Sequence, residues 1–416
     1  MNRTKRALMA CAVLGALLLN TFSAYAQNTP TNQIYLPLVA SPDSATGQVI
    51  AGQYIVVFKD EEMGISSVSA VASEMATSYG GELLQTYDAA LNGFAVKFPE
   101  ETRANAEAAL KQDSRVAYVE PDQVISLNEE NAVDTTQFGA TWGLDRIDQA
   151  SLPLNSRFTY TSTGAGVNAY IIDTGIRITH SQFGGRASYG YDAVDGRLPA
   201  DDCNGHGTHV AGTVGGSTYG VAKGVRLIAV RVLSCDGFGS FSGVIAGINW
   251  VKQQKLARPN IPAVANMSLG GYATQALDSA VASAVQAGVI FAVAAGNNNA
   301  DACYFSPART ATAITVGATY SNDARAGFSN YGTCVDIFAP GGNISSAWST
   351  SDAATAILSG TSMATPHVVG VIALYLQTRP TATPLAVDAA LKARALLNKV
   401  TSSGVGSPNR LLFTNY

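Results

Sequence analysis

Charged side chains and histidines are scarce in this 416-residue chain. Only 13% of its residues are Asp, Glu, Lys or Arg, it has four histidines, and no glutamate follows Glu130. Together with 40 glycines and 47% hydrophobic residues, this composition excludes a disordered or coiled-coil protein and indicates a compact, loop-rich one. The length is sufficient for one large core and a smaller companion domain.

Long apolar runs are missing from most of the chain. After residue 26, no uninterrupted apolar stretch approaches the roughly 20 residues of a membrane helix, so we expect no membrane partner. The first 26 residues combine the cationic MNRTKR, the apolar ALMACAVLGALLL and the small-x-small pattern Ala24-Tyr25-Ala26. They predict a signal peptide (1–26) and a secreted, extracellular protein. Leu8–Cys11 superficially resembles a lipoprotein cleavage box, yet it precedes most of the apolar run.

Cysteine is rare, and one of the five cysteines, Cys11, leaves with the signal peptide. The other four form an even set in an exported protein, which favours disulfides: Cys203, Cys235, Cys303 and Cys334. Four cysteines permit three pairings, and their spacing alone does not choose among them.

Charge divides the chain into two parts. Residues 27–134 carry five Lys or Arg against sixteen Asp or Glu, a net of −11, whereas residues 135–416 carry eighteen against fourteen, a net of +4. A separate acidic module bound to a mildly basic one would show this asymmetry, because complementary fields orient docking. Compositional drift between domains is the alternative.

The acidic part has a folding pattern of its own after a polar linker. We expect strands and helices in the order strand, helix, strand, strand, helix, strand, which is the split arrangement of a small ferredoxin-like α+β domain. The segments located by pattern are strand 53–59, helix 65–79, strand 91–98, helix 101–112 and strand 116–122. The polar NEENAVDTTQ that follows resembles a cleavable linker.

Beyond Thr135 the pattern becomes an alternation of buried strands and helices. The expected strands are 167–172, 225–232, 263–267, 289–294 and 313–317, and the expected helices are 206–214, 242–254, 273–287 and 362–378. This alternation predicts an α/β fold with a mostly parallel sheet and helices on both faces. Functional groups of such sheets gather at the carboxyl ends of the strands.

Four residues in this part carry a pattern of nucleophilic catalysis. Ser362, in SGTSMATPH, lies where an apolar helix begins, and taken alone it is a candidate helix cap. A serine becomes a nucleophile when a base takes its proton and a third group orients that base. His206 in NGHGTH and Asp173, directly after a buried strand, supply these groups, and Asn297 in AVAAGNNN could donate to an oxyanion together with the Ser362 N–H.

The motifs YIIDTGI, NGHGTHVAGT, VANMSLGG, AVAAGNNNADA and SGTSMATPH, in this order, resemble the subtilisin-like serine proteases (subtilases), in particular the proteinase K branch and the aqualysin-type secreted alkaline proteases. The resemblance implies a peptidase domain over 135–416 that hydrolyses peptide bonds. It implies Asp173 as orienting acid, His206 as general base and acid, Ser362 as nucleophile and Asn297 as oxyanion donor. His209 becomes structural, because a zinc site with His206 would lack a third ligand.

The resemblance also implies where a peptide substrate binds. It would add as an extended strand between Ser268-Leu269-Gly270 and the run containing Gly237 and Gly239. The primary pocket would be lined by Ser268, Leu269, Gly270, Ala294, Ala295 and Gly296. Since these stretches carry no charge, we expect apolar or aromatic side chains to be preferred over Lys or Arg. Ordinary strand ends are the alternative.

Among the three cysteine pairings, the resemblance selects Cys203 with Cys235 and Cys303 with Cys334. It implies structural Ca²⁺ and no catalytic metal or organic cofactor. The first calcium site would use Asp336 and carbonyls near Ala311 and Ala313, and the second would use Asp145, Asp148 and Gln149, because Ca²⁺ prefers hard oxygen ligands. Surface acids that form helix caps or ion pairs are the alternative.

The acidic module resembles the inhibitory propeptide of the same family, through YIVVFK, LNGFAVKF and VAYVEPDQ. It would act as chaperone and inhibitor until self-cleavage near Asp134-Thr135, which makes 27–134 a linker and propeptide. The expected partners are protein and peptide substrates and this propeptide, with no nucleic acid, and the protein would be a monomer.

Two rival functions remain for comparison. An α/β-hydrolase esterase would carry its serine in a G-x-S-x-G elbow and the order Ser, acid, His, whereas Ser362 lies in GTSMA. A catalytically silent secreted peptide-binding relative would lack one of the four residues named above, and this chain has all of them.

Overall fold

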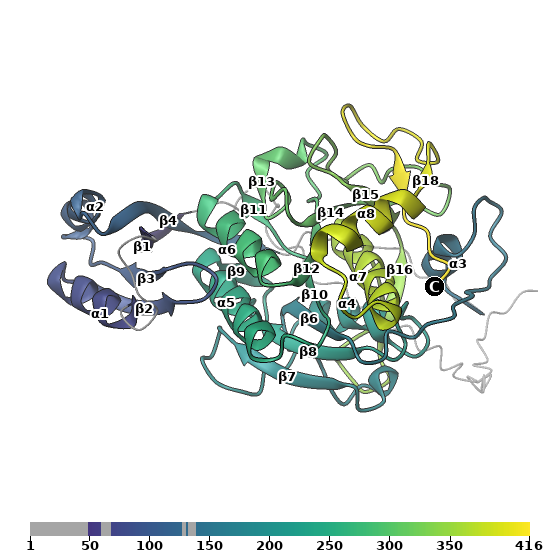
Figure 1. Ribbon diagram of the computed structural model, residues 1–416, viewed down its shortest axis with the longest axis horizontal. Helices are drawn as coiled ribbons and strands as arrows, with labels where there is room; N and C mark the ends of the chain where they lie inside the picture. The colour runs from purple at the N-terminus through teal and green to yellow at the C-terminus, as the bar shows by residue number, and fades with distance from the viewer. Residues whose placement is uncertain (1–48, 60–67, 127–129, 132–138) are drawn as a thin grey trace, which may run out of the picture. The chain divides into compact units, whose positions relative to one another are not determined.

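A computed structural model describes residues 49–59, 68–126, 130–131 and 139–416 of the chain. The predicted signal peptide, most of the linker after it and the expected cleavage boundary at Asp134-Thr135 lie outside these residues. The described part comprises a small N-terminal module and a large α/β domain (Figure 1).

The N-terminal module is an antiparallel sheet with two helices, in the predicted order. Its elements are β1 (Val49–Phe58), α1 (Val68–Ser78), β2 (Glu82–Tyr87), β3 (Gly93–Lys97), α2 (Arg103–Gln112) and β4 (Val116–Ser126). In the sheet, β1 lies between β3 and β4, and β2 lies outside β3. The sequence pattern does not locate β2, because most of ELLQTY is half-buried and shows no alternation of apolar and polar residues.

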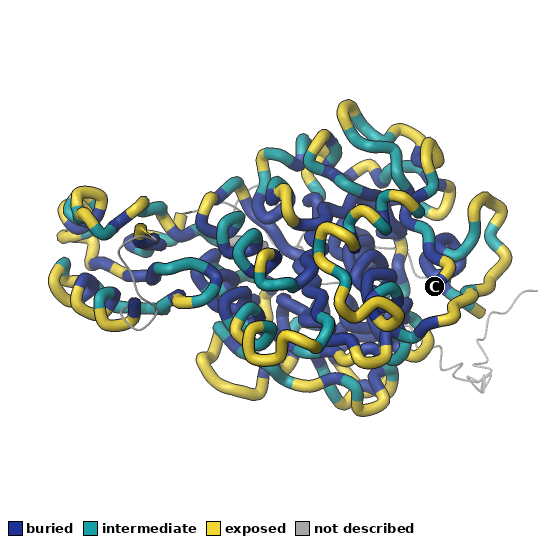
Figure 2. Tube along the Cα trace, viewed as in Figure 1, coloured by how far each residue is buried: buried dark blue, intermediate teal, exposed yellow. Residues whose placement is uncertain are grey.

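The large domain is built on a nine-stranded, mostly parallel sheet, as predicted. Its order is β18 (Leu396–Leu397), β19 (Arg410–Leu411), β15 (Ile337–Pro340), β14 (Ile314–Thr319), β12 (Val289–Ala294), β10 (Ala263–Met267), β6 (Asn168–Asp173), β8 (Arg226–Arg231) and β7 (Ala187–Asp192). Only β18 and β19 pair antiparallel. The central strands β10 and β12 are buried throughout (Figure 2), which explains their almost continuous apolar sequence.

Helices cover both faces of this sheet. One core cluster contains residues of α4 (His206–Gly215), α7 (Thr361–Thr378) and α8 (Pro384–Arg394), and a second contains residues of α5 (Phe241–Ala257) and α6 (Gln275–Gln286). The four predicted helices are all present, with ends displaced by a few residues at most. Within the described ranges, no helix combines the length and the apolar character needed to cross a bilayer.

Short elements complete the described structure. They are α3 (Trp142–Ile147), β9 (Phe238–Ser240), β11 (Gly271–Tyr272), β13 (Phe305–Ser306), β16 (Ile344–Ala347), β17 (Thr355–Ser359), the two-residue β5 (Glu130–Asn131) and 3₁₀ turns at Ser181–Phe183 and Ala302–Tyr304. The strand β5 pairs with β17, and β9 pairs with β4 of the N-terminal module.

Strand β1 shows how the N-terminal module buries both faces of its sheet. Tyr54, Val56 and Phe58 belong to the core under α1 and α2, whereas Ile55 and Val57 belong to the cluster that contains residues of α5 and α6. Because successive side chains of a strand point to opposite faces, the run YIVVF supplies both cores. The module therefore packs on α5 and α6 of the large domain through the back of its sheet.

Candidate active site

The carboxyl end of β6 brings a carboxylate against an imidazole. Asp173 is the last residue of β6, and its Oδ1 lies 2.6 Å from Nδ1 of His206, the first residue of α4. Both side chains are fully buried. Burial lowers the pKa of His206 well below its usual range, so the ring is neutral at neutral pH. With Nδ1–H donated to Asp173, the lone pair is on Nε2, where a base needs it.

The loop before His206 is held by a buried aspartate. Asp202 accepts hydrogen bonds from the N–H of Gly205 through Oδ1 and from the N–H of Thr208 through Oδ2, both at 2.8 Å. Gly205 has a φ of 120°, and a Cβ there would lie 2.4 Å from the ring of Trp348, so the turn requires glycine. Sequence reasoning misses Asp202, because it lies three residues before the capping position at which such a residue is expected.

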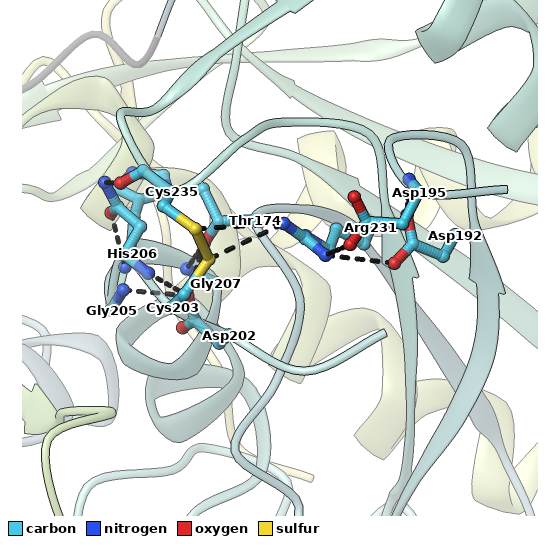
Figure 3. Close-up of a disulfide and its surroundings, with 11 residues drawn as sticks. Thr174, Asp192, Asp195, Asp202, Cys203, Gly205, His206, Gly207, Arg231 and Cys235 are labelled. Carbon is cyan, nitrogen blue, oxygen red and sulfur yellow. Dashed lines mark hydrogen bonds and ion pairs between the residues drawn. A yellow bond between two sulfur atoms is a disulfide. The ribbon is translucent and has the colours of Figure 1, made fainter. Parts of the chain in front are cut away.

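A disulfide ties this loop to the segment before β9. Cys203 is bonded to Cys235, and Asn204 Nδ2 donates to the Cys235 carbonyl at 2.8 Å. Figure 3 shows the disulfide between the His206 turn and Arg231, whose Nη2 lies 3.5 Å from the Cys203 sulfur. The second disulfide joins Cys303 and Cys334. Both pairings implied by the resemblance are present.

Ser362 lies in the first turn of α7 but is not its cap. The capping residue is Gly360, which has no side chain, so the helix-cap interpretation of Ser362 is wrong. The buried hydroxyl of Ser362 donates to the carbonyl of Ser268 at 3.2 Å, and Ser268 Oγ donates to the carbonyl of Ser362 at 2.7 Å. Asn266 Nδ2 donates to Ser268 Oγ at 2.8 Å. The end of β10 thus fixes the serine.

Asn297 is oriented by the residue before the serine. Its Oδ1 accepts hydrogen bonds from both the N–H and the hydroxyl of Thr361, each at 2.9 Å. The Thr361 hydroxyl in turn accepts from the N–H of Gly296 at 3.1 Å. Because the carbonyl end of the amide is held in this way, the NH₂ end is the one directed away from Thr361. Sequence reasoning does not single out Thr361, whose only signal is its place beside the serine.

A small pocket lies beside these residues and is lined by backbone, small side chains and one aromatic ring. Its lining residues are Gly270, Gly271, Ala294, Ala295, Gly296, Asn298, Phe305, Ser306 and Ala308. The lining includes four predicted positions, Gly270 and Ala294 to Gly296, and no ionisable side chain. Two predicted positions do not line it: Ser268 contacts Ser362, and the side chain of Leu269 is buried in a core cluster.

The predicted peptide-binding edge is occupied by the N-terminal module. The end of β4 pairs antiparallel with β9, with Val124 opposite Ser240, Ile125 opposite Gly239 and Ser126 opposite Phe238. Gly237 directly precedes β9 and has a φ of 79°, which favours glycine. An extended segment of the chain therefore lies as an added strand along this edge.

Two carboxylates of β4 cap helices of the large domain. Asp122 accepts from both the N–H and the hydroxyl of Ser242 at the start of α5. Glu120 accepts from the Thr274 hydroxyl at 2.5 Å and from the Ala276 N–H at 2.8 Å, at the start of α6. The acids satisfy N–H groups that the helices leave open and face the positive ends of the helix dipoles.

At the expected calcium site, the carboxylate of Asp336 is paired with a lysine. Asp336 Oδ1 lies 2.8 Å from Nζ of Lys392, and Oδ2 accepts from the N–H of Thr315 at 2.9 Å. An ammonium group thus lies on the Asp336 oxygen that a metal ion would use, and the other oxygen accepts a backbone N–H, so this carboxylate as it stands does not fit Ca²⁺. The sequence could not reveal this, because Lys392 is 56 residues away along the chain.

The second expected site keeps oxygen atoms without partners. Among the residues that the structure describes, neither Asp148 Oδ1 nor Gln149 Oε1 receives a hydrogen bond, although both are buried. Gln149 Nε2 donates to the carbonyls of Ser151 and Pro153, which fixes the direction of Oε1. Burial and the nearby Asp145 carboxylate raise the pKa of Asp148. Buried oxygens with like charges nearby suit a cation.

Two other histidines, His209 and His367, contact backbone carbonyls. His209 Nε2 lies 3.0 Å from the Ile344 carbonyl, and His367 Nδ1 lies 2.9 Å from the Met363 carbonyl. In the described part of the chain, no three His, Cys, Asp or Glu side chains are grouped as metal ligands.

Comparisons with known proteins identify both parts. Residues 164–411 match the model of the subtilase family, and residues 53–128 match that of the peptidase inhibitor I9 family. The chain is 50% identical over 421 residues to an extracellular serine proteinase of Thermus sp. (strain Rt41A), covering 97% of this chain and 98% of the relative. It is 47% identical to alkaline serine exoprotease A of Vibrio alginolyticus, covering 98% and 77% of the two chains.

Solved structures agree with this assignment. A cold-adapted subtilisin-like serine proteinase is 55% identical, with a TM-score of 0.64, and covers 67% of this chain and 100% of its own. Fervidolysin from Fervidobacterium pennivorans shares the fold at 22% identity, with a TM-score of 0.70 over 88% of this chain and 60% of its own. The chain belongs to the subtilase family and carries an I9-type inhibitor module ahead of its α/β domain.

Proposed function

We propose that the chain is a secreted serine endopeptidase in which Ser362 is the nucleophile. The observation that carries the proposal is the buried 2.6 Å contact between Asp173 and His206. His206 Nε2 takes the proton of Ser362 Oγ as this oxygen attacks the substrate carbonyl carbon. Asp173 holds the ring and stabilises the imidazolium, and His206 then protonates the departing amine. Water releases the acyl group by the same steps in reverse order.

The oxyanion that forms during the attack would be stabilised by two donors. These are the Asn297 side-chain NH₂ and the backbone N–H of Ser362 in the first turn of α7. The hydrogen bonds from Thr361 support this assignment, because they hold the Asn297 carbonyl oxygen away from the anion. The helix dipole adds partial positive charge at the same point.

Peptide substrates would bind along β9, where Gly237 to Ser240 offer a free edge once the end of β4 has left. Ser268 to Gly270 would contribute the opposite side. The pairing of β4 with β9 supports strand addition as the binding mode. The uncharged pocket beside Ala294 to Gly296 supports a preference for apolar or aromatic side chains before the scissile bond.

The protein would be made as a self-processed zymogen. We assign 1–26 to the signal peptide, 27–134 to the linker and propeptide, and 135–416 to the mature domain, which would act as a monomer. The I9 match and the strand that covers β9 support inhibition by the propeptide. Export is supported by the Thermus relative, which is named an extracellular proteinase.

Structural Ca²⁺ would bind at the second site, through Asp145, Asp148 and Gln149. The oxygens without partners on Asp148 and Gln149 support this assignment. The ion would neutralise the two carboxylates and fix the loop after α3, with no part in the chemical steps.

A labelling experiment tests the catalytic assignment. The processed enzyme is treated with a fluorophosphonate, digested and analysed by mass spectrometry, and peptides with Phe or Lys before the scissile bond are assayed in parallel. We expect the label on Ser362, loss of activity in step with labelling, and a kcat/KM for the Phe peptide at least 10-fold higher. A protein that binds peptide but neither labels nor cleaves would instead be a silent peptide-binding relative.

A further inference from the structure

We propose that the ammonium group of Lys392 takes the place of a calcium ion at Asp336. Helix α8 and the start of β15 would then be held together by a cation of the chain itself. The resemblance implies a metal there, and the described residues provide an ion pair. The proposal concerns the stability of the domain and does not depend on the catalytic assignment.

Lys392 bridges two carboxylates from different elements. Its Nζ lies 2.8 Å from Oδ1 of Asp336, which directly precedes β15, and 2.8 Å from Oδ2 of Asp388, one turn earlier on α8. About 30% of the Lys392 side chain is exposed, and the two acids are covered to a similar extent. The ammonium thus fastens α8 to the edge of the central sheet.

The second oxygen of Asp336 is also engaged. Oδ2 accepts from the N–H of Thr315, and the Asp336 N–H donates to the Thr315 carbonyl, both at 2.9 Å. These bonds hold the carboxylate in one orientation, with Oδ1 toward α8. A metal ion on Oδ1 would meet the ammonium at hydrogen-bond distance, so one cation must displace the other.

The ammonium group of Lys392 lies between two carboxylates and donates a hydrogen bond to each of them, to Oδ1 of Asp336 and to Oδ2 of Asp388. Without the ammonium, two carboxylates would face one point, which is a donor set suited to Ca²⁺.

Calcium content tests the proposal in the full-length chain. All variants carry Ser362→Ala to prevent self-digestion and Asp148→Asn to remove the other expected site, and bound calcium is measured after equilibrium dialysis against CaCl₂. Adding Asp336→Asn should leave the calcium content unchanged. A loss of one calcium per chain on adding Asp336→Asn would overturn the proposal, because Asp336 would then hold Ca²⁺ despite Lys392.

A second test asks whether calcium binds once Lys392 is removed. On the same background, Lys392→Met should bind one additional calcium per chain, and CaCl₂ should raise its thermal unfolding midpoint relative to EDTA. Lys392→Arg, which keeps the charge, and the exposed Lys399→Met should show neither change. If Lys392→Met folds and binds no additional calcium, the geometry around Asp336 is not that of a cation site, and the proposal is wrong.

Discussion

At the scale of single residues, the orientation of Asn297 is the most specific feature of the site. Thr361 holds its Oδ1 through two hydrogen bonds, so the amide cannot turn its oxygen toward a developing anion without breaking both. If Asn297 is the proposed oxyanion donor, its amide would need no reorientation during the reaction.

Asn297→Ala should therefore lower kcat by about 10²- to 10³-fold with little change in KM, because the donor acts mainly on the transition state. Steady-state kinetics on an apolar peptide measure both constants. Thr361→Val, which removes one of the two restraining hydrogen bonds, should lower kcat by about 10-fold. A kcat for Asn297→Ala within threefold of wild type would exclude Asn297 as an oxyanion donor.

Lys223 provides a residue-scale test of pH dependence. Its Nζ donates to the carbonyls of Ser217 and Gly220 and lies 5.8 and 5.7 Å from the ring centroids of Phe158 and Tyr160. Burial lowers the pKa of Lys223 to about 8, from an ordinary value of 10.5. The folded state thus favours the neutral amine. Between pH 8 and 10.5 the unfolded state binds more protons, so stability should rise with pH.

Comparing Lys223→Met with its parent isolates this effect. Both proteins carry Ser362→Ala. From pH 8 to pH 10 the free energy of unfolding should rise by about 1 kcal/mol more in the parent than in Lys223→Met. The expected difference is smaller than the full pKa shift would give, because solvent screens a partly exposed group. Denaturant unfolding at the two pH values measures the difference, with the exposed Lys399→Met as control. Equal pH dependence in all three proteins would show that Lys223 titrates normally.

At the scale of elements, two carboxylates of the N-terminal module contact the N-termini of α5 and α6. The capping residue of α6, Thr274, makes no side-chain cap of its own, and Glu120 serves the Ala276 N–H instead. Asp122 does the same at Ser242 of α5. Removal of the module would leave these N–H groups to water.

Asp122→Asn should weaken the hold of the cleaved module on the mature domain by about 10-fold, because a charge-assisted hydrogen bond at a helix N-terminus becomes a neutral one. The cleaved complex is diluted serially, and the rate of peptide hydrolysis is measured immediately after each dilution. The dependence of this rate on concentration gives the dissociation constant of the complex. Asp88→Asn removes the same charge from an exposed position that contacts Gln253, and should change the constant less than threefold. Equal effects of both variants would contradict specific capping.

Some elements of this fold could be predicted from the sequence and others could not. The strands β6, β10 and β12 and the helices α4 and α7 follow from local apolar patterns, and Asp173, His206, Ser362 and Asn297 from motifs beside them. The contact between Lys392 and Asp336 could not be predicted, because it joins segments far apart in sequence. No local pattern indicates the pairing of β4 with β9 either, and only the resemblance to an inhibitory propeptide points to it. Asp336 has the same local sequence whether a metal or an ammonium group faces it.

At the scale of the whole molecule, the division of charge matches the division of the fold. Residues 27–134, which carry a net negative charge, include the N-terminal module, and residues 135–416 carry a small net positive charge. Two carboxylates on strand β4 of the module cap helices α5 and α6 of the large domain. The same strand covers the edge at which a substrate would bind. The strand β4 thus takes part in docking and also covers the edge that the proposed substrate would use, and cleavage between the two parts is the step that would separate them.

The most direct test of this account follows the intact mass of the full-length chain and of its Ser362→Ala variant over time. We predict that the wild type separates into a propeptide and a mature domain beginning near Thr135 and then hydrolyses an apolar peptide, whereas Ser362→Ala stays full length and inactive. Cleavage of the variant at the same position and rate as the wild type would contradict self-processing by Ser362. A wild type that stays intact and inert would contradict the proposed protease function.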